Sequence, residues 1–187
     1  MTDKGHGQID YFKPTYKDIN VGAFLLPGPA ANLPDEDEFK DSGGVDTGIT
    51  TYAFAPTEYV DGIFELQHDY MEGTDLTFHV HWQGITAPGG GTDNVQFQLI
   101  YTLGRSGVVL ASATTITVEV AVTTQYAFNI SSFAAITGTT FLIGDQFLFN
   151  FGRIAASADE YAGDALVATV GIHYQVDTLG SAQIASK

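Results

Sequence analysis

The chain contains no cysteine, which excludes disulfides, thiolate metal sites and cysteine nucleophiles at once. It also has no run of apolar residues long enough to span a membrane. The first residues, Met1 to Gly7, lack the apolar segment of a secretory signal peptide. We therefore expect a soluble protein that is made in the cytoplasm. At 187 residues, we expect one domain that can bury a sizeable core without cross-links.

Basic residues are also scarce. Lysine and arginine together number 7 against 22 acidic residues, which gives a formal net charge of −15. Between residues 41 and 186 only Arg105 and Arg153 are basic. All the lysines except Lys187 lie in the first forty residues. A surface of this charge repels phosphate backbones. We therefore expect neither nucleic acid nor a membrane as a partner.

What the sequence has in abundance is alternation of apolar and polar residues. The longest case runs from Ala165 to Asp177, and its apolar parity contains Leu166, Ala168, Val170, Ile172, Tyr174 and Val176. Because strand side chains alternate between faces, this run predicts one long strand. Similar patterns occur at residues 63–68, 75–83, 95–103, 108–122, 125–130 and 145–151. Seven or eight strands, with one short helix candidate at 131–136, predict an all-β antiparallel sandwich, most simply a jelly roll.

Residues 1–57 differ in composition from the rest. They hold five of the six prolines and an acidic run, Asp35 to Glu38. Proline fixes φ and removes a donor, so we expect an extended N-terminal arm with loops rather than sheet interior. The arm also contains Tyr11, Phe12 and Phe24, which are too apolar for a solvated tail. It should lie along its own domain or a neighbouring subunit, with residues 58–187 forming the β-sandwich domain.

His79-Val80-His81 is the sharpest local signal for chemistry. On a strand, these two imidazoles project from one face at a separation of roughly 7 Å, which suits two ligands of a zinc, iron or manganese ion. The glutamate and later histidine block of the cupin metal motif are missing. His173 could be a third ligand only if its strand lies adjacent. We favour neutral histidines on a polar sheet face or a subunit interface, and we predict no metal site.

Two acidic loops with glycine turns, residues 68–75 and 158–164, could supply carboxylates to calcium. Neither has the spacing of a recognised calcium loop, so plain solvated turns are the favoured reading. A glycosidase acid and base could also be imagined between these loops, although nothing in the sequence makes them converge. The candidate carboxylates are Asp69, Glu72 and Asp75 in the first loop and Asp159, Glu160 and Asp164 in the second.

Motifs of nucleophilic and phosphate chemistry are missing from the sequence. No serine lies in a Gly-x-Ser-x-Gly elbow, and no glycine run precedes a lysine. Gly89 to Gly91 is flanked by turn residues and is expected to form a hairpin loop. Trp82 and Tyr101 could stack on a sugar ring, but both have the apolar parity of their strands and are expected in the core. We therefore predict no catalytic residues, no cofactor and no enzyme activity.

Two segments resemble a group of tailed-bacteriophage structural proteins. They are Phe64 to Trp82 and Gly163 to Ser181, and the strand that begins at Asn94 and the tripeptide Gly152-Arg153-Ile154 also fit. The likeness covers roughly residues 60 to 181 and leaves out the arm. The resemblance implies a small β-rich subunit of the virion, commonly oligomeric and without enzyme activity. His79, His81 and His173 lie within these segments, and the resemblance carries no metal role for them.

We therefore expect a virion structural protein, assembled in the host cytoplasm, that acts by binding. A capsid decoration, cement or head-spike protein fits best, and its partner would be the major capsid protein or another virion protein. Three-fold capsid sites favour a homotrimer. The alternatives are a tail-fibre or carbohydrate-binding module, which requires exposed aromatic residues in a groove, and a metal-dependent jelly-roll enzyme.

Overall fold

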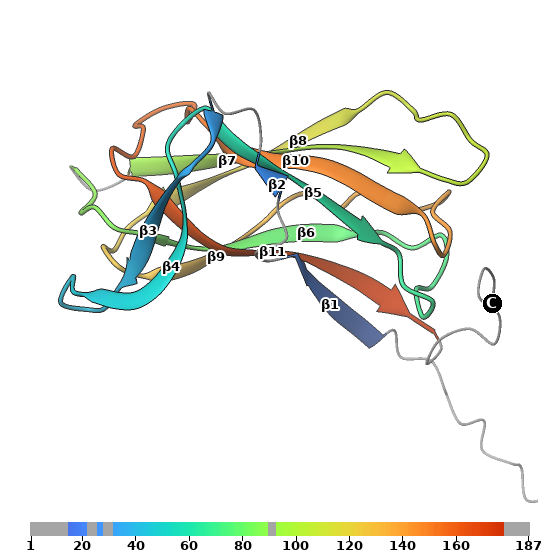
Figure 1. Ribbon diagram of the computed structural model, residues 1–187, viewed down its shortest axis with the longest axis horizontal. Helices are drawn as coiled ribbons and strands as arrows, with labels where there is room; N and C mark the ends of the chain where they lie inside the picture. Colours follow the sequence, from blue (N-terminus) through green and yellow to red (C-terminus); the bar gives the residue numbers. More distant parts are fainter. Residues whose placement is uncertain (1–14, 22–25, 28–31, 90–92, 178–187) are drawn as a thin grey trace, which may run out of the picture.

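The computed structural model describes residues 15–21, 26–27, 32–89 and 93–177, where the chain forms strands joined by turns (Figure 1). One sheet has the order β3-β4-β11-β6-β9 and carries β1 on β11. Its strands are β1 (Thr15–Val21), β3 (Asp35–Lys40), β4 (Asp46–Phe54), β6 (Thr77–Gly84), β9 (Phe128–Ser132) and β11 (Ala165–Val176). The other sheet, in the order β2-β5-β10-β7-β8, contains β2 (Leu26–Pro27), β5 (Glu58–Glu65), β7 (Asp93–Gly104), β8 (Thr114–Val122) and β10 (Gln146–Ile154).

The eight strands from β4 to β11 form a jelly roll. Four of them, β4, β11, β6 and β9, are neighbours in the first sheet, and β5, β10, β7 and β8 are neighbours in the second. The chain changes sheet at every step along this series except between β7 and β8, and all the pairs are antiparallel. This is the arrangement of a double-sheet jelly roll. The predicted fold class is confirmed. Within the described ranges, no helix is long and apolar enough to cross a membrane.

The core lies between the two sheets and is rich in aromatic rings. Phe147, Phe149 and Phe151, which share one parity of β10, are all buried. Phe147 stacks on Phe64 with ring centroids 4.8 Å apart, and Phe151 stacks on Phe97 at 5.5 Å. These rings bury large apolar areas, and their offset and edge contacts add to that burial. The alternation of these strands therefore identified the core face correctly.

The terminal strand departs from the predicted parity at one residue. The pairing of β11 with β6 shifts register between Val167 and Thr169, where Ala168 is an additional residue. A bulge of this kind moves the following side chains to the other face. Val167 therefore belongs to the core together with Val170 and the later members of the predicted apolar parity. Leu166 is fully buried but is not a member of the cluster that contains Val170, and Ala168 is only partly buried, so the predicted parity fails at these two residues.

The described part of residues 1–57 is paired with the domain itself. β1 pairs with β11 over seven positions, β2 with β5, and β3 with β4. The expectation that this stretch avoids the sheet interior is wrong for residues 46–54, because β4 lies between β3 and β11. The proposed division at residue 57 falls in the turn between β4 and β5. Residues 1–14 lie outside the described residues.

Two further predicted elements differ from the structure. The apolar run from Val108 to Val122 forms a strand only from Thr114, because the last pair between β7 and β8 is Tyr101 with Thr114. The helix candidate at 131–136 is not helical, since residues 131 and 132 end β9 and Ile136 forms an isolated bridge with Leu76. In both cases pairing with a neighbouring strand decides the local structure, and local propensity does not.

Arg153 forms a buried connection between β10, the end of β4 and the loop before β11. Its side chain is fully buried, and its Nη1 donates to the carbonyls of Phe54 at 3.0 Å and Gly163 at 2.5 Å. Its Nη2 donates to the carbonyl of Tyr161 at 2.5 Å and to Glu160 Oε1 at 2.6 Å. Charged donors in a region of low dielectric make strong hydrogen bonds, so this residue fixes three separate segments.

Replacing Arg153 with leucine should destabilise the fold strongly. The change leaves buried carbonyl groups without donors and Glu160 without its cation, which costs about 3 kcal/mol. Urea denaturation followed by tryptophan fluorescence measures the loss. Lys40→Leu is the matched control, because Lys40 pairs with Asp37 and Asp46 at the surface, where ion pairs contribute little. Equal losses in the two variants would contradict this role of Arg153.

Candidate functional site

The outer face of the first sheet gathers the polar side chains of β1, β11 and β6. Gly171 of β11 lies opposite His79 of β6, and His173 lies opposite Thr77. On the other edge of β11, Asp18 of β1 lies opposite His173. The condition stated from the sequence, that the strand of His173 must lie beside that of His79, is therefore met.

Asp18, His79 and His173 form a compact cluster of possible ligand atoms. One nitrogen or oxygen atom from each lies within 4.8 Å of the others. Asp18 Oδ2 is 3.5 Å from His79 Nε2 and 3.7 Å from His173 Nε2. The two imidazole rings have centroids 4.3 Å apart. His81 lies beside His79 with centroids 4.9 Å apart, but it is not a member of this cluster.

The burial of His79 depends on a glycine. The residue is 1% exposed, and its ring lies over Gly171 of the neighbouring strand. A Cβ atom at position 171 would be 2.3 Å from His79 Nε2 and 3.0 Å from Asp18 Oδ1. Within the described residues, His79 Nδ1 has no hydrogen-bond partner. A buried polar atom without a partner costs free energy, so the position of this imidazole is not explained by packing alone.

Burial also changes the ionisation of His79. It lowers the pKa of the imidazole, an effect that the Asp18 carboxylate opposes and that His173 and His81 reinforce. Desolvation disfavours the charged form of a buried histidine. The ring is therefore neutral near pH 7, which is the form that accepts a hydrogen bond or binds a metal ion.

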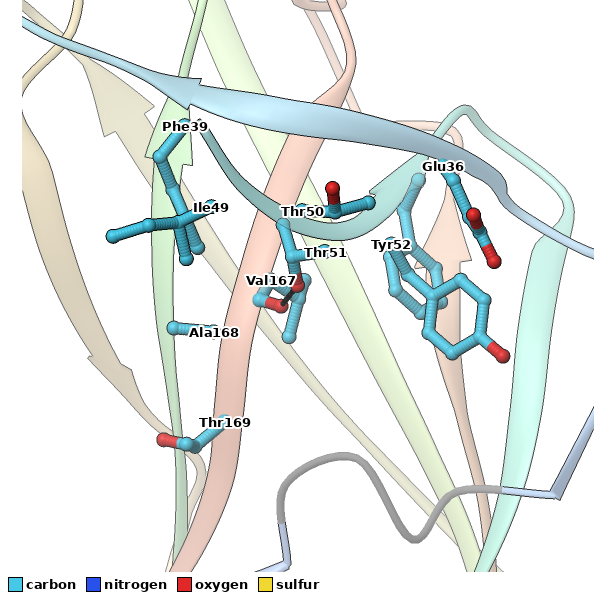
Figure 2. A pocket seen from close by; sticks show the side chains of 10 residues that line it. Glu36, Phe39, Ile49, Thr50, Thr51, Tyr52, Val167, Ala168 and Thr169 are labelled. Carbon is cyan, nitrogen blue, oxygen red and sulfur yellow. Dashed lines mark hydrogen bonds between the residues drawn. The ribbon is translucent and has the colours of Figure 1, made fainter. Parts of the chain in front are cut away.

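A groove lies on the same face, where β4 separates from β11. β4 pairs with β11 only from Ala165 to Val167, and β1 pairs with the same edge from Val170 onward. A cavity of about 520 Å³ opens between these two stretches, beneath the β3–β4 hairpin (Figure 2). Its lining is mixed, with Glu36, Phe39, Ile49, Thr50, Thr51, Tyr52 and Phe54 from the hairpin and Val167, Ala168 and Thr169 from β11.

The hairpin is held over the sheet by Gln83 of β6. The backbone N–H of Lys40 donates to Gln83 Oε1 at 2.9 Å, and Gln83 Nε2 donates to the carbonyls of Lys40 and Tyr126 at 2.8 and 3.0 Å. Phe39 of the hairpin meets Phe128 of β9 with ring centroids 6.2 Å apart. Phe128 is 57% exposed, so an aromatic edge is presented to solvent beside the groove.

Carboxylates from both acidic loops make contacts within the fold. Asp69 accepts a hydrogen bond from Tyr174 and pairs with Lys17. Glu72 and Asp75 accept from the backbone N–H groups of residues 143 and 138, at 3.0 Å in each case. In the second loop, Glu160 pairs with Arg153. The backbone carbonyl of Asp159 accepts a hydrogen bond from the N–H of Asn94. Burial raises the pKa of the Glu58 carboxyl, and the nearby charge of Asp164 adds to this effect. Contrary to the expectation from the sequence, the turns are therefore not simply solvated, because several of their carboxylates hold parts of the fold together.

The loops do not meet, so they cannot form the acid and base of a glycosidase. The first loop bridges to Val176 at the end of β11, and the second loop leads into Ala165 at its start. Twelve residues of strand separate these ends by on the order of 36 Å. Paired catalytic carboxylates of glycosidases lie roughly 5–9.5 Å apart.

The two candidate sugar-stacking residues belong to the core. Trp82 is completely buried and its Nε1 donates to Ser131 Oγ at 2.9 Å. Tyr101 is partly buried and stacks on Phe147 with centroids 5.8 Å apart.

The predicted hairpin loop at residues 89–91 falls between β6 and β7. The N–H of Gly89 donates to Asp93 Oδ2 there, whereas residues 90–92 lie outside the described residues.

Sequence reasoning missed Asp18, Gly171 and Phe39. Asp18 is a single acid in the N-terminal segment, and no local pattern connects it with a histidine 61 or 155 residues away. Gly171 occupies a polar-parity position of β11, where an isolated glycine in a strand indicates a close approach of neighbouring atoms. This glycine was the one signal in the sequence, and it indicated close packing rather than a ligand-binding role.

Replacing Gly171 with alanine should force the His79 ring out of its position. We expect a loss of about 1–3 kcal/mol in the free energy of unfolding, because overpacking displaces a buried ring. In a His79→Ala background the same change should cost much less, since the added methyl group then occupies vacated space. A double-mutant cycle by urea denaturation measures this coupling. Additive effects would contradict the contact.

No family model matches the chain, and no curated protein matches it. Among solved structures, it is similar to the CBM22-1-GH10 modules of Clostridium thermocellum endo-1,4-β-D-xylanase 10B complexed with xylohexaose, at 13% identity and a TM-score of 0.40. That match covers 90% of this chain, which spans 27% of the xylanase chain. TmCBM61 in complex with β-1,4-galactotriose matches at 12% identity and a TM-score of 0.36, over 86% of this chain and 88% of that one.

The stem and receptor-binding domain of spike protein P1 from bacteriophage PM2 matches at 6% identity and a TM-score of 0.26, over 89% of this chain and 97% of that one. Similarity this weak carries no argument about activity or partners. The assignment of the sandwich fold depends on the chain's own sheet topology.

Proposed function

We propose that the chain is a structural subunit of a tailed-phage particle. It attaches to the shell as a homotrimeric decoration, cement or head-spike protein, with the major capsid protein or another virion protein as its partner, and it acts by binding rather than by catalysis. The basis is the resemblance of residues 64–82 and 163–181 to phage virion proteins, together with the position of these segments in the fold.

The observation that carries the proposal is that the described parts of the two resembling segments, residues 64–82 and 163–177, form one structural unit. β6 and β11 pair over eight positions in the middle of the first sheet. The loop before β6 also joins the end of β11, because Tyr70 bridges to Val176 and the N–H of Met71 donates to the carbonyl of Gln175 at 2.8 Å. Because the two segments that carry most of the resemblance are neighbours in one sheet, they support a common domain better than scattered matches would.

An exposed apolar turn offers a surface for the partner. Val108, Val109 and Leu110 between β7 and β8 are 60%, 91% and 52% exposed. The turn lies at the opposite end of the sandwich from the β3–β4 hairpin (Figure 1). Burying an exposed valine or leucine side chain contributes roughly 1.5–3 kcal/mol, so three adjacent ones can anchor a contact. β3 and β4 are engaged in their own sheet, so the turn is the better candidate for this contact.

Particles made by the genome that encodes the chain should contain it at a copy number divisible by three. Quantitative mass spectrometry of purified particles measures that number. Val109→Asp should weaken attachment to particles at least about 10-fold. A 10-fold loss corresponds to ~1.4 kcal/mol, and losing an apolar contact of this size costs more than that.

The matched control for this test is Val45→Asp, which places the same charge at an apolar residue of the β3–β4 turn that is 63% exposed. This variant should attach as well as the unmodified chain. Particles that lack the chain, or equal attachment by both variants, would show that the proposal is wrong.

The groove beneath the β3–β4 hairpin favours a second function, the binding of a carbohydrate. Phe39 and Tyr52 belong to its lining, and Glu36 and Thr50 provide hydrogen-bonding groups beside them (Figure 2). Sites of this kind combine an apolar surface with a few polar groups that fix orientation. A tail-fibre tip or carbohydrate-binding module would use the groove to bind a glycan.

A glycan array with the full chain tests this second function. Saturable binding to an oligosaccharide should be lost on Phe39→Ala, because the substitution removes an aromatic wall of the groove. Met71→Ala serves as the control, since Met71 is exposed on the loop before β6 and lies outside the groove. Absence of binding to every glycan, or the same loss in both variants, rules the carbohydrate function out.

A further inference from the structure

We propose that Asp18, His79 and His173 bind a divalent first-row transition-metal ion, for which zinc is the best-suited candidate, and that this ion fastens β1 to the first sheet. The inference goes beyond the proposed attachment function and does not depend on it. It also departs from the expectation of no metal that we drew from the sequence.

The geometry of the three side chains fits such an ion. Zinc bound tetrahedrally at about 2.0–2.1 Å from each ligand places the ligand atoms roughly 3.3–3.4 Å apart. Asp18 Oδ2 lies 3.5 Å from His79 Nε2 and 3.7 Å from His173 Nε2, and all three ligand atoms lie within 4.8 Å of one another. Small side-chain adjustments therefore suffice. Two imidazoles and one carboxylate are ligands that zinc, iron(II) and manganese(II) accept.

Burial and charge at the cluster also suit a cation. His79 is held in a fixed position over Gly171, where a side chain larger than hydrogen would occupy the space of its ring. His173 is 49% exposed, which leaves the site open to solvent on one side. The nearest lysine in sequence, Lys17, pairs with Asp69 and so leaves the charge of Asp18 available. The net charge of −15 raises the local concentration of cations.

The three ligands come from three different strands, and this gives the ion a structural consequence. Asp18 belongs to β1, His79 to β6 and His173 to β11. Among the described residues, β1 is an edge strand that pairs only with β11. An ion held by all three strands also connects β1 to β6, which lies on the far side of β11. Release of β1 would then require the loss of one metal ligand, so metal binding opposes local opening of this edge.

Isothermal titration calorimetry of zinc into the untagged, metal-free full chain tests the site. We expect one ion per chain. Asp18→Asn and His173→Ala, which alter partly exposed side chains and so keep the fold, should each weaken binding by more than the 10–100-fold that is typical of outer-shell partners. The matched control is His81→Ala, which removes a neighbouring histidine outside the cluster and should leave zinc affinity within about twofold.

Hydrogen exchange of the β1 amides provides a second, independent measurement. At a free zinc concentration 100 times the dissociation constant, exchange in β1 should slow by up to about 100-fold. The effect should vanish in Asp18→Asn. The proposal is overturned by any of three results: no stoichiometric binding of zinc, manganese(II) or iron(II); binding that survives both ligand variants; or binding that is lost in His81→Ala but kept in Asp18→Asn.

Discussion

β11 is the strand on which the rest of the molecule depends, because its two edges must satisfy three partners. β6 pairs with one edge along nearly its full length, whereas β4 and β1 share the other. An unpaired strand edge exposes backbone donors and acceptors, so the stretch that β4 leaves must be covered by another element. β1 covers it from Val170 to Val176, and the gap between β4 and β1 contains the bulge at Ala168.

That division of one edge creates both surfaces of interest on the outer face. Where β4 separates, the β3–β4 hairpin curves over the sheet and encloses the groove with Thr169 at its border. Where β1 takes over, Asp18 is brought beside His173 and His79. The groove and the ligand cluster are therefore two results of one geometric constraint. Either can be altered through the register of β11, because a shift of one residue exchanges the faces of all the side chains beyond it.

The few charged residues in the interior each have a definite structural role. Charged residues make up 16% of the chain, and the buried ones have specific structural partners. Arg153 joins β10 to the end of β4 and to the loop before β11. Asp145 forms an ion pair with Arg105, in which Oδ2 lies 2.6 Å from Nη2. Breaking such pairs is costly because one member remains buried and uncompensated. The acidic surplus is left to the surface, where it limits association with other anionic molecules.

The sequence by itself determined the fold class and most of the core. Period-two alternation placed Phe78, Trp82 and Phe151 inside correctly, because the side-chain period of a strand is a local property. It could not foresee the bulge at Ala168 or the role of β4 as an interior strand, since both arise from the register between distant segments. The same is true of the site. His79 and His81 were visible as a pair on one strand, whereas Asp18 and Gly171 join His79 only through the pairing of β1, β11 and β6.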